Sequence, residues 1–279
     1  MTTFTFSDRR RLASRVARFV TTTVSDLAKL EVARLRVGLL GSRAAAGSPA
    51  HSPDMLALVH NHKAAWARRM LEIFAIDARP HGPFLDEGKL YPGTDSRGIG
   101  RVFLFNHRSG MDIMLSLSFF EGYIVSRGDL ATWPLIGLAA RRAGTLFVDR
   151  ADAKSGAAVI NRMARALKDG QGICIYPEGT AFAGDEVRPL RSGAFRAAQK
   201  AGAELVPVGF AYEDPNTTYG EESFAAHMER VASMRRIVAA VEVGEPFPST
   251  GTLGELCTRG REELQRCVTR ARARLCSSS

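Results

Sequence analysis

The order of apolar and polar positions divides the chain into short apolar runs and longer amphipathic stretches. Apolar runs of strand length occupy residues 101–105, 123–125, 146–148, 172–176, 205–210 and 236–243. Apolar residues at helical spacing predict helices over about 112–120, 153–169, 192–201 and 252–275. Short buried strands that alternate with helices are typical of an α/β fold with a largely parallel central sheet flanked by helices.

Three local signals refine this outline. A helix over about 54–75 precedes a stretch at 79–99 that is rich in proline and glycine and is expected to be mostly loop. Pro207 lies inside an apolar run, which predicts an edge strand or a bulge because proline donates no ladder hydrogen bond. Thr252 and Glu255 have the spacing of a capping box, which marks the start of the last helix.

The beginning of the chain has a different pattern, that of a basic amphipathic helical arm. Nine Lys or Arg and three Asp or Glu lie in residues 1–43, and apolar residues recur among them at near-helical spacing. Such a helix is typical of a segment that lies in a membrane interface. The alternative is a helix docked on its own domain with a solvated basic face. We expect residues 1–45 to form this arm and residues 46–279 to form the main domain.

Composition narrows the partners and cofactors to expect. The net charge of +9 suggests an anionic partner, and an anionic membrane surface is favoured over nucleic acid because no nucleic-acid-binding motif is present. The chain contains no run of eighteen apolar residues, so no transmembrane helix is expected. The four cysteines include no C-x-x-C pair, and neither a metal site nor a cofactor is expected.

Two histidine–aspartate pairs share one spacing: His107 and Asp112 in FNHRSGMD, and His81 and Asp86 in HGPFLD. His107 follows a predicted strand and Asp112 opens a predicted helix, with a Ser-Gly bend between them. On a continuous helix a five-residue step would leave the side chains roughly 140° apart, so this bend is needed. The carboxyl end of a strand is also where open α/β sheets bind ligands. No strand is predicted before HGPFLD, and His81 is expected to be an ordinary loop histidine.

Three further segments end predicted strands. Arg150 follows one strand in LFVDR, and Glu178 with Gly179 follows another in YPEGT. Taken alone, Arg150 is better explained as a surface arginine, whereas Glu178 is explained equally well as a solvated turn residue. The VPVG segment around Pro207 is expected to be structural rather than catalytic.

In this order, the Asn-His-four-residues-Asp segment, FVDR, YPEGT and VPVG resemble the four motifs of the glycerolipid acyltransferase family. The best-known members of this family are the 1-acylglycerol-3-phosphate acyltransferases. The resemblance runs from about Val102 to Pro246, roughly half of the chain. The connecting segments SRGDLATWPLIG and RSGAF are also similar to the family's segments before its second motif and after its third.

The resemblance implies an O-acyltransferase that moves a fatty acyl group from acyl-CoA or acyl-carrier protein to the hydroxyl of a lysolipid. His107 would be the general base, since neutral imidazole accepts a proton near physiological pH. Asp112 would orient the imidazole and stabilise the imidazolium that forms, as the acid does in a serine hydrolase triad. Arg150, Glu178, Gly179 and Thr180 would shape the acceptor site, and a peripheral position on the cytoplasmic side of a membrane is expected.

One departure concerns the acceptor. Family members that use a phosphate acceptor usually carry Arg after E-G-T, whereas this chain has Ala181. A phosphate would lose a bidentate partner there, although Arg188 and Arg191 are close enough in sequence to compensate. We expect 1-acylglycerol-3-phosphate first, giving phosphatidic acid for phospholipid biosynthesis, because it is the commoner family activity. Lyso-ornithine lipid, whose headgroup has no phosphate, is the alternative.

Two other classes of protein remain as competitors. A hydrolase such as a thioesterase would use related groups, but the chain has no G-x-S-x-G nucleophile elbow. A non-catalytic membrane lipid-binding protein would suit the basic arm, but such a protein has no need of the pair His107 and Asp112.

Overall fold

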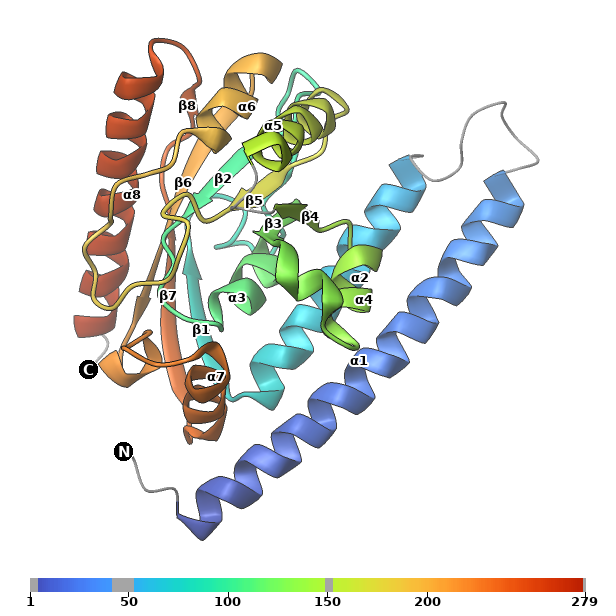
Figure 1. Ribbon diagram of the computed structural model, residues 1–279, viewed down its shortest axis with the longest axis vertical. Coiled ribbons are helices and arrows are strands. Elements are labelled where there is room, and N and C mark those ends of the chain that lie inside the picture. The colour runs from blue at the N-terminus through green and yellow to red at the C-terminus, as the bar shows by residue number, and fades with distance from the viewer. Residues whose placement is uncertain (1–4, 42–52, 149–152, 278–279) are drawn as a thin grey trace.

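The computed structural model describes residues 5–41, 53–148 and 153–277, and one eight-stranded sheet forms its centre (Figure 1). Its strands are β1 (Ile76–His81), β2 (Val102–Phe105), β3 (Tyr123–Arg127), β4 (Leu146–Val148), β5 (Ile173–Ile175), β6 (Glu204–Tyr212), β7 (Ile237–Val243) and β8 (Phe247–Pro248). Seven of them lie in the order β1-β7-β6-β2-β5-β3-β4, and β8 pairs with β6. This confirms the predicted α/β fold.

The direction of the strands decides which segments meet at each edge of the sheet. β2 pairs in parallel with β5 and β6, and β3 pairs in parallel with β4 and β5. β7 is antiparallel to β6, and β1 is parallel to β7. The carboxyl ends of β2 to β6 therefore share one edge, while β1 ends at the opposite edge.

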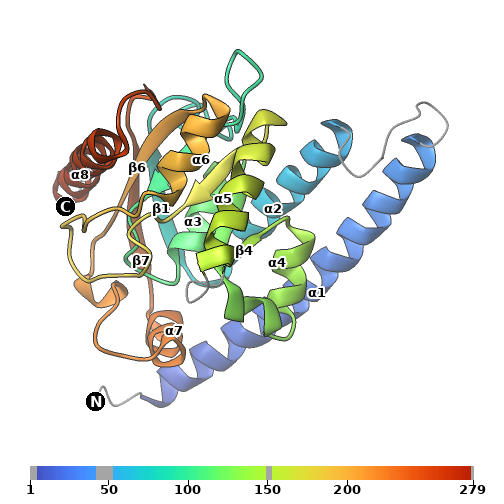
Figure 2. The same ribbon diagram turned by 45° about the horizontal axis from the view of Figure 1, so that its top comes forward.

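Helices cover both faces of the sheet. They are α1 (Phe6–Gly41), α2 (Pro53–Ile73), α3 (Asp112–Phe119), α4 (Ile136–Arg142), α5 (Ala153–Lys168), α6 (Gly193–Ala201), α7 (Phe224–Ser233) and α8 (Leu253–Cys276), with short 3-10 turns at Gly128–Thr132 and Pro215–Thr217. One apolar core joins the sheet to α2, α3 and α7 and includes Phe19 of α1, whereas a second joins it to α5, α6 and α8. Figures 1 and 2 both show α1 and α8 on opposite sides of the sheet.

The predicted helices are present, and the last helix begins with the predicted capping box of Thr252 and Glu255. Two predictions were only partly right. Residues 79–99 are mostly loop, as expected, but residues 79–81 complete β1, an edge strand that pairs with β7 and carries few apolar residues. Pro207 does not mark an edge strand, because β6 lies between β2 and β7. It lies where pairing on one side of β6 changes from β8 to β7, so the proline interrupts no continuous ladder on that side.

The helix of the predicted arm, α1, is docked on the domain through polar contacts. The buried Arg15 donates to the carbonyl oxygens of Ala232 and Met234, at 2.8 and 2.5 Å. The buried Asp26 pairs with Arg69 of α2 at 2.5 Å. Several apolar side chains of α1 instead face outward: Phe6, Val16, Val20, Val24, Val32 and Leu35. Across the described ranges, no helix is both long enough and apolar enough to cross a bilayer.

Candidate active site

His107 and Asp112 lie together at the carboxyl end of β2. Phe105 ends β2 and Asp112 opens α3, so the turn between them brings the two side chains to one place. His107 Nδ1 is 2.7 Å from Asp112 Oδ2. The Asp112 side chain is completely buried, whereas the His107 side chain is 22% exposed. The pair therefore joins a buried acceptor to an imidazole that solvent can reach.

Fixed donors surround the Asp112 carboxylate. The backbone N–H groups of Arg108 and Ser109 donate to Asp112 Oδ2 at 2.7 and 2.9 Å, and the Tyr212 hydroxyl donates to Oδ1 at 2.6 Å. Burial, together with the Asp112 charge, raises the pKa of Tyr212 well above its usual range, so this hydroxyl keeps its proton. Because an ionised carboxylate only accepts, we assign the His107 proton to Nδ1, which leaves Nε2 as a proton acceptor.

Neighbouring side chains fix the position of the imidazole. The Tyr176 ring packs against His107 with ring centroids 4.5 Å apart, and the Tyr176 hydroxyl donates to Ser116 Oγ at 3.0 Å. Asn106, fully buried, joins β2 to β6: its Nδ2 donates to the Phe210 carbonyl at 2.9 Å, and its Oδ1 accepts the Phe210 N–H at 2.7 Å. The chain just before His107 is therefore locked to the centre of the sheet.

Glu178 lies beside this pair, but both of its oxygens are occupied by the protein itself. Oε1 accepts from the His107 N–H at 2.9 Å and from Arg108 Nη1 at 2.8 Å. Oε2 accepts from the Arg188 N–H at 2.9 Å. The Glu178 and Arg108 side chains are buried and form an ion pair. In this arrangement Glu178 faces the loop of residues 106–111, which carries His107, rather than open solvent.

The other predicted acceptor residues are placed differently. Gly179 has φ +84°, and a Cβ there would lie 2.3 Å from Arg191 Nε, so the turn requires glycine and Arg191 lies directly against it. Thr180 is exposed and Ala181 is half-buried. The Phe182 N–H donates to the His107 carbonyl at 3.0 Å, which connects this loop to the loop of residues 106–111. Arg150 lies outside the described residues.

The second pair also forms a contact, with 2.9 Å between His81 Nδ1 and Asp86 Oδ1. His81 ends β1, so the expectation that it follows no strand was wrong. The pair nevertheless lies at the opposite edge of the sheet from His107, and its side chains are 41% and 52% exposed. This contact is solvated and far from the Glu178 loop.

An apolar cavity of about 250 Å³ opens next to the turn between His107 and Asp112. It lies between the sheet and α1, α2, α3, α4 and α7, and its lining includes Phe19, Trp66, Gly110, Met114, Trp133 and Met228. Lys63 of α2 also lines it and donates to the Gly122 carbonyl at 2.8 Å. Burial lowers the pKa of Lys63 to about 8.

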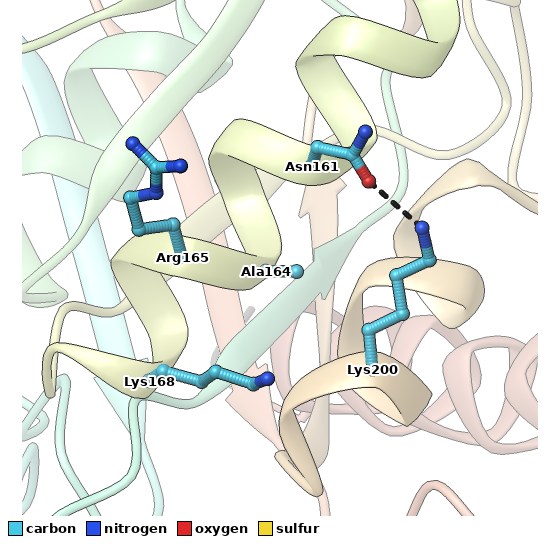
Figure 3. Close-up of a pocket in the computed structure, with 5 residues that line it drawn as sticks. All are labelled: Asn161, Ala164, Arg165, Lys168 and Lys200. Atoms are coloured by element: carbon cyan, nitrogen blue, oxygen red, sulfur yellow. Dashed lines mark hydrogen bonds between the residues drawn. The ribbon is translucent and has the colours of Figure 1, made fainter.

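A second hollow lies on the other face of the sheet, between α5 and α6. Figure 3 shows Arg165 and Lys168 on α5 and Lys200 on α6, with Lys200 Nζ donating to Asn161 Oδ1 at 2.8 Å. None of the predicted site residues lines it. Within the part of the chain that the structure describes, no group of three or more His, Cys, Asp or Glu is placed to hold a metal ion.

The sequence did not identify three residues that organise this site: Arg108, Tyr212 and His227. Arg108 stands inside FNHRSGMD, but arginine is mostly exposed in proteins, and nothing in the pattern marks this one as buried. Tyr212 is the last residue of β6, the longest of the described strands. A tyrosine hydroxyl at the end of an apolar run was the one sequence signal that could have suggested a buried hydrogen-bond donor there. His227 lies on α7, more than a hundred residues from His107, and no spacing connects the two.

The fold and the site together define an α/β protein in which a buried aspartate holds a solvent-accessible histidine beside an apolar cavity. Residues 94–211, which include both members of the pair and the YPEGT loop, match the family model described as Acyltransferase.

Individual relatives agree with this match. A lyso-ornithine lipid O-acyltransferase from Rhodobacter capsulatus is 33% identical over 183 residues, which are 59% of this chain and 65% of that protein. A 1-acyl-sn-glycerol-3-phosphate acyltransferase from Neisseria gonorrhoeae is 23% identical over 149 residues, 51% of this chain and 58% of that protein. The chain therefore spans less than two thirds of these curated relatives.

Among solved structures, the 1-acyl-sn-glycerophosphate (LPA) acyltransferase PlsC from Thermotoga maritima has a similar fold, with a TM-score of 0.51. The likeness covers 90% of this chain and 98% of that one at 18% sequence identity. At this identity the likeness concerns the fold alone.

Proposed function

We propose that this protein is an O-acyltransferase that moves a fatty acyl group from a thioester donor to the hydroxyl of a lysolipid. One observation carries the proposal: a buried aspartate holds a solvent-accessible imidazole beside an apolar cavity. Gly110 lines the cavity and lies only three residues after His107. An acyl chain in the cavity would bring its thioester toward His107 Nε2.

The geometry suits attack by a hydroxyl without a covalent acyl-enzyme. His107 Nε2 accepts the hydroxyl proton as the hydroxyl oxygen bonds to the thioester carbonyl carbon. The negative charge of Asp112 stabilises the imidazolium that forms. When the carbon–sulfur bond breaks, the imidazolium returns its proton to the leaving thiolate. Atoms and charge balance with no other reactant, and acyl-CoA and acyl-carrier protein are both thioesters of the required kind.

The acceptor headgroup is either that of lyso-ornithine lipid, which has no phosphate, or that of 1-acylglycerol-3-phosphate. Ala181 leaves the position after E-G-T without a guanidinium, which favours a headgroup that has no phosphate. The relative with 33% identity is named for lyso-ornithine lipid, and this also supports that headgroup. For 1-acylglycerol-3-phosphate, Arg191 is the available cation beside the Gly179 turn. Arg150 and Thr180 keep their proposed places at the acceptor site, whereas Glu178 is better explained as a support of the catalytic loop.

The activity is tested with purified protein, labelled acyl-CoA or acyl-carrier protein, and lysolipids with and without a phosphate. Transfer by the wild type and its loss in His107→Ala are expected, while His81→Ala should retain near-normal turnover. Near-normal transfer by His107→Ala would refute the mechanism. Release of free fatty acid without any lysolipid would indicate a hydrolase, and lipid binding without transfer to any lysolipid would indicate a non-catalytic lipid-binding protein.

We also propose that α1 lies on an anionic lipid surface, where acceptor and product reside. Val16, Val20 and Val24 follow one another at four-residue steps and are exposed, which places them on one outward face of α1. Ile136 and Leu138 of α4 are exposed as well, and α4 contacts α1. An outward apolar stripe on a basic helix is typical of interfacial binding.

Sedimentation with vesicles that contain phosphatidylglycerol tests this second proposal. The double variant Val20→Asp with Val24→Asp should bind several-fold more weakly than wild type. The matched control, Ala157→Asp with Ala158→Asp, adds the same charge at exposed positions of α5 on the other face of the sheet. Equal binding by the two variants would contradict the role of α1.

A further inference from the structure

The Ser109-Gly110 turn is the mechanical link between His107 and Asp112, and α7 packs directly against it. A Cβ on Gly110 would lie 2.4 Å from Met228 Sδ and 3.5 Å from the His227 ring. A side chain at residue 110 would therefore require Met228 to move, which shows how closely α7 packs against this turn. The position of this turn depends on a helix that lies outside residues 94–211.

His227 makes specific polar contacts with that turn. Its side chain is 0% exposed, and its Nε2 lies 3.0 Å from the Gly110 backbone nitrogen and 3.1 Å from Ser109 Oγ. A backbone N–H can only donate, so Nε2 must accept and the imidazole is neutral, with its proton on Nδ1. Burial lowers the pKa of His227, which agrees with a neutral ring.

Two charged side chains hold the other end of the imidazole. His227 Nδ1 lies 3.0 Å from Glu222 Oε1, and Arg230 Nε donates to Glu222 Oε2 at 3.2 Å. The bond from Arg230 holds the pKa of Glu222 down at about 2, so the acceptor of the Nδ1 proton is a carboxylate. The Tyr219 ring stacks on His227 with centroids 3.9 Å apart. The imidazole is thus confined in its plane, its tautomer and its direction.

The contacts continue from this cluster to the catalytic pair. Ser109 contacts His227 through its hydroxyl, while its backbone N–H donates to Asp112 Oδ2 at 2.9 Å. The same Asp112 oxygen accepts from His107 Nδ1. An unbroken series of hydrogen bonds therefore runs from Arg230 through Glu222, His227 and Ser109 to the carboxylate.

We propose that His227, held by Glu222 and Arg230, is a positioning residue that fixes the Ser109-Gly110 turn so that Asp112 meets His107 in reactive geometry. The inference rests on the proposed acyl transfer and deepens it. His227 touches neither the reacting atoms nor the proposed acyl chain; it acts through the turn. Phe224 and Met228 of the same helix line the apolar cavity, so donor binding has to be measured separately from turnover.

Two substitutions separate the acceptor role of His227 from its bulk. In His227→Gln the amide reaches the place of Nε2 and can still accept the Gly110 N–H, whereas the shorter His227→Asn cannot. His227→Asn should lower kcat by about 10²-fold, because small displacements of catalytic groups have effects of that size. KM for the acyl donor should change little, and His227→Gln should recover at least tenfold of the lost kcat.

Glu229→Gln is the matched control, because Glu229 is an exposed residue of α7. It should leave kcat unchanged. An unchanged kcat in folded His227→Asn, or an equal loss in the Gln and Asn variants, overturns the inference. If His227→Asn does not fold, Glu222→Gln replaces it at a partly exposed position and should lower kcat with KM unchanged; normal kcat would again overturn the inference.

A second measurement does not require activity. In the NMR spectrum of the full chain, the His107 Nδ1 proton bonded to Asp112 should give a downfield signal that is lost in His227→Asn and retained in His227→Gln. Persistence of the signal in His227→Asn contradicts the positioning role even if the wild type transfers no acyl group. Absence of transfer by a wild type that shows this behaviour would instead refute the proposed function alone.

Discussion

Replacing Glu178 by Gln tests whether this carboxylate supports the catalytic loop or binds the acceptor. The substitution keeps the shape of the side chain but replaces one oxygen by an NH₂ group. In the protein, Oε1 accepts from the His107 N–H and the Arg108 guanidinium, and Oε2 accepts from the Arg188 N–H. The single oxygen of glutamine can accept either from the donors at the Oε1 position or from the donor at the Oε2 position. At the remaining position the NH₂ group of glutamine faces another donor, and no hydrogen bond forms there.

The size of the effect follows from burial. The Arg108 and Glu178 side chains are 1% and 0% exposed, so loss of the carboxylate leaves a buried guanidinium without its counter-charge. Removing one partner of a buried ion pair costs about 3–5 kcal/mol. Arg108 Nη1 and Nη2 keep their bonds to the carbonyls of His107 and Glu186, which places the expected loss at the lower end, about 3 kcal/mol.

Urea unfolding and steady-state kinetics with varied lysolipid measure the two possibilities together. If Glu178 supports the loop that carries His107, Glu178→Gln should lower the free energy of unfolding by about 3 kcal/mol. It also predicts a reduced kcat, since the His107 backbone moves, with little change in KM for the lysolipid. Glu186→Gln is the matched control: its side chain is 61% exposed and pairs with Arg188 at the surface. That change should cost at most about 1 kcal/mol.

One result would refute this reasoning. If Glu178→Gln is as stable as the Glu186→Gln control and raises KM for the lysolipid with kcat retained, the carboxylate binds the acceptor. The role first expected from its place after Y-P would then be correct, and the buried pair would be a minor contributor to stability.

Two further predictions concern backbone and charge. Gly179→Ala and Gly184→Ala should each cost about 1–2 kcal/mol, because φ is +84° and +76° at these positions and a side chain adds strain there. The exposed Arg191 side chain, whose Nε would lie 2.3 Å from the new Cβ in Gly179→Ala, should move aside at little further cost; urea unfolding compares the two variants, and a clearly larger loss in Gly179→Ala would contradict this. Burial lowers the pKa of Lys63 to about 8, so between pH 8 and about 10.4 the unfolded chain binds more protons at this group, which alone makes stability rise with pH by about 3 kcal/mol. Burial raises the pKa of Cys174 and Cys267 to about 12, which opposes this rise, so the measurement is the difference between wild type and Lys63→Met: unfolding free energies should move in favour of wild type by about 3 kcal/mol across this range, and parallel curves would contradict it.

The hydrophobic pattern was sufficient to predict most of the fold because most strands are continuous apolar runs. β2 and β7 are buried at every position, and strands covered on both faces need mostly apolar residues. β1 has the sequence IDARPH and is mostly half-buried, because only one neighbour and one layer cover it. An edge strand of this kind carries little periodic signal. Its existence depends on β7, more than 150 residues away in the chain.

The sequence predicted which two residues meet at the candidate site better than it predicted their supporting contacts. The contact between His107 and Asp112 could be predicted because a strand end, a bend and a helix start are local features. Tyr212, Arg108 and His227 approach the pair from other elements, and their roles follow from burial and direction, which a one-dimensional pattern does not contain. The predicted role of Glu178 shows the same limit, because position in a motif does not reveal whether a carboxylate faces a ligand or the protein's own donors.

A comparison of the two histidine–aspartate pairs shows which structural property separates a candidate catalytic pair from a surface contact. Both pairs have the same spacing, both lie at the carboxyl end of a strand, and their nitrogen–oxygen distances are 2.7 and 2.9 Å. They differ in the acid: Asp86 is 52% exposed, so water competes for its oxygens and the contact is worth at most about 1 kcal/mol. Asp112 is 0% exposed and its donors belong to the protein, so its charge acts on the imidazole without rearrangement of solvent. Strand direction then puts only His107 beside Glu178 and the apolar cavity. Burial of the orienting acid, rather than spacing or contact, therefore distinguishes the candidate base from an ordinary surface pair.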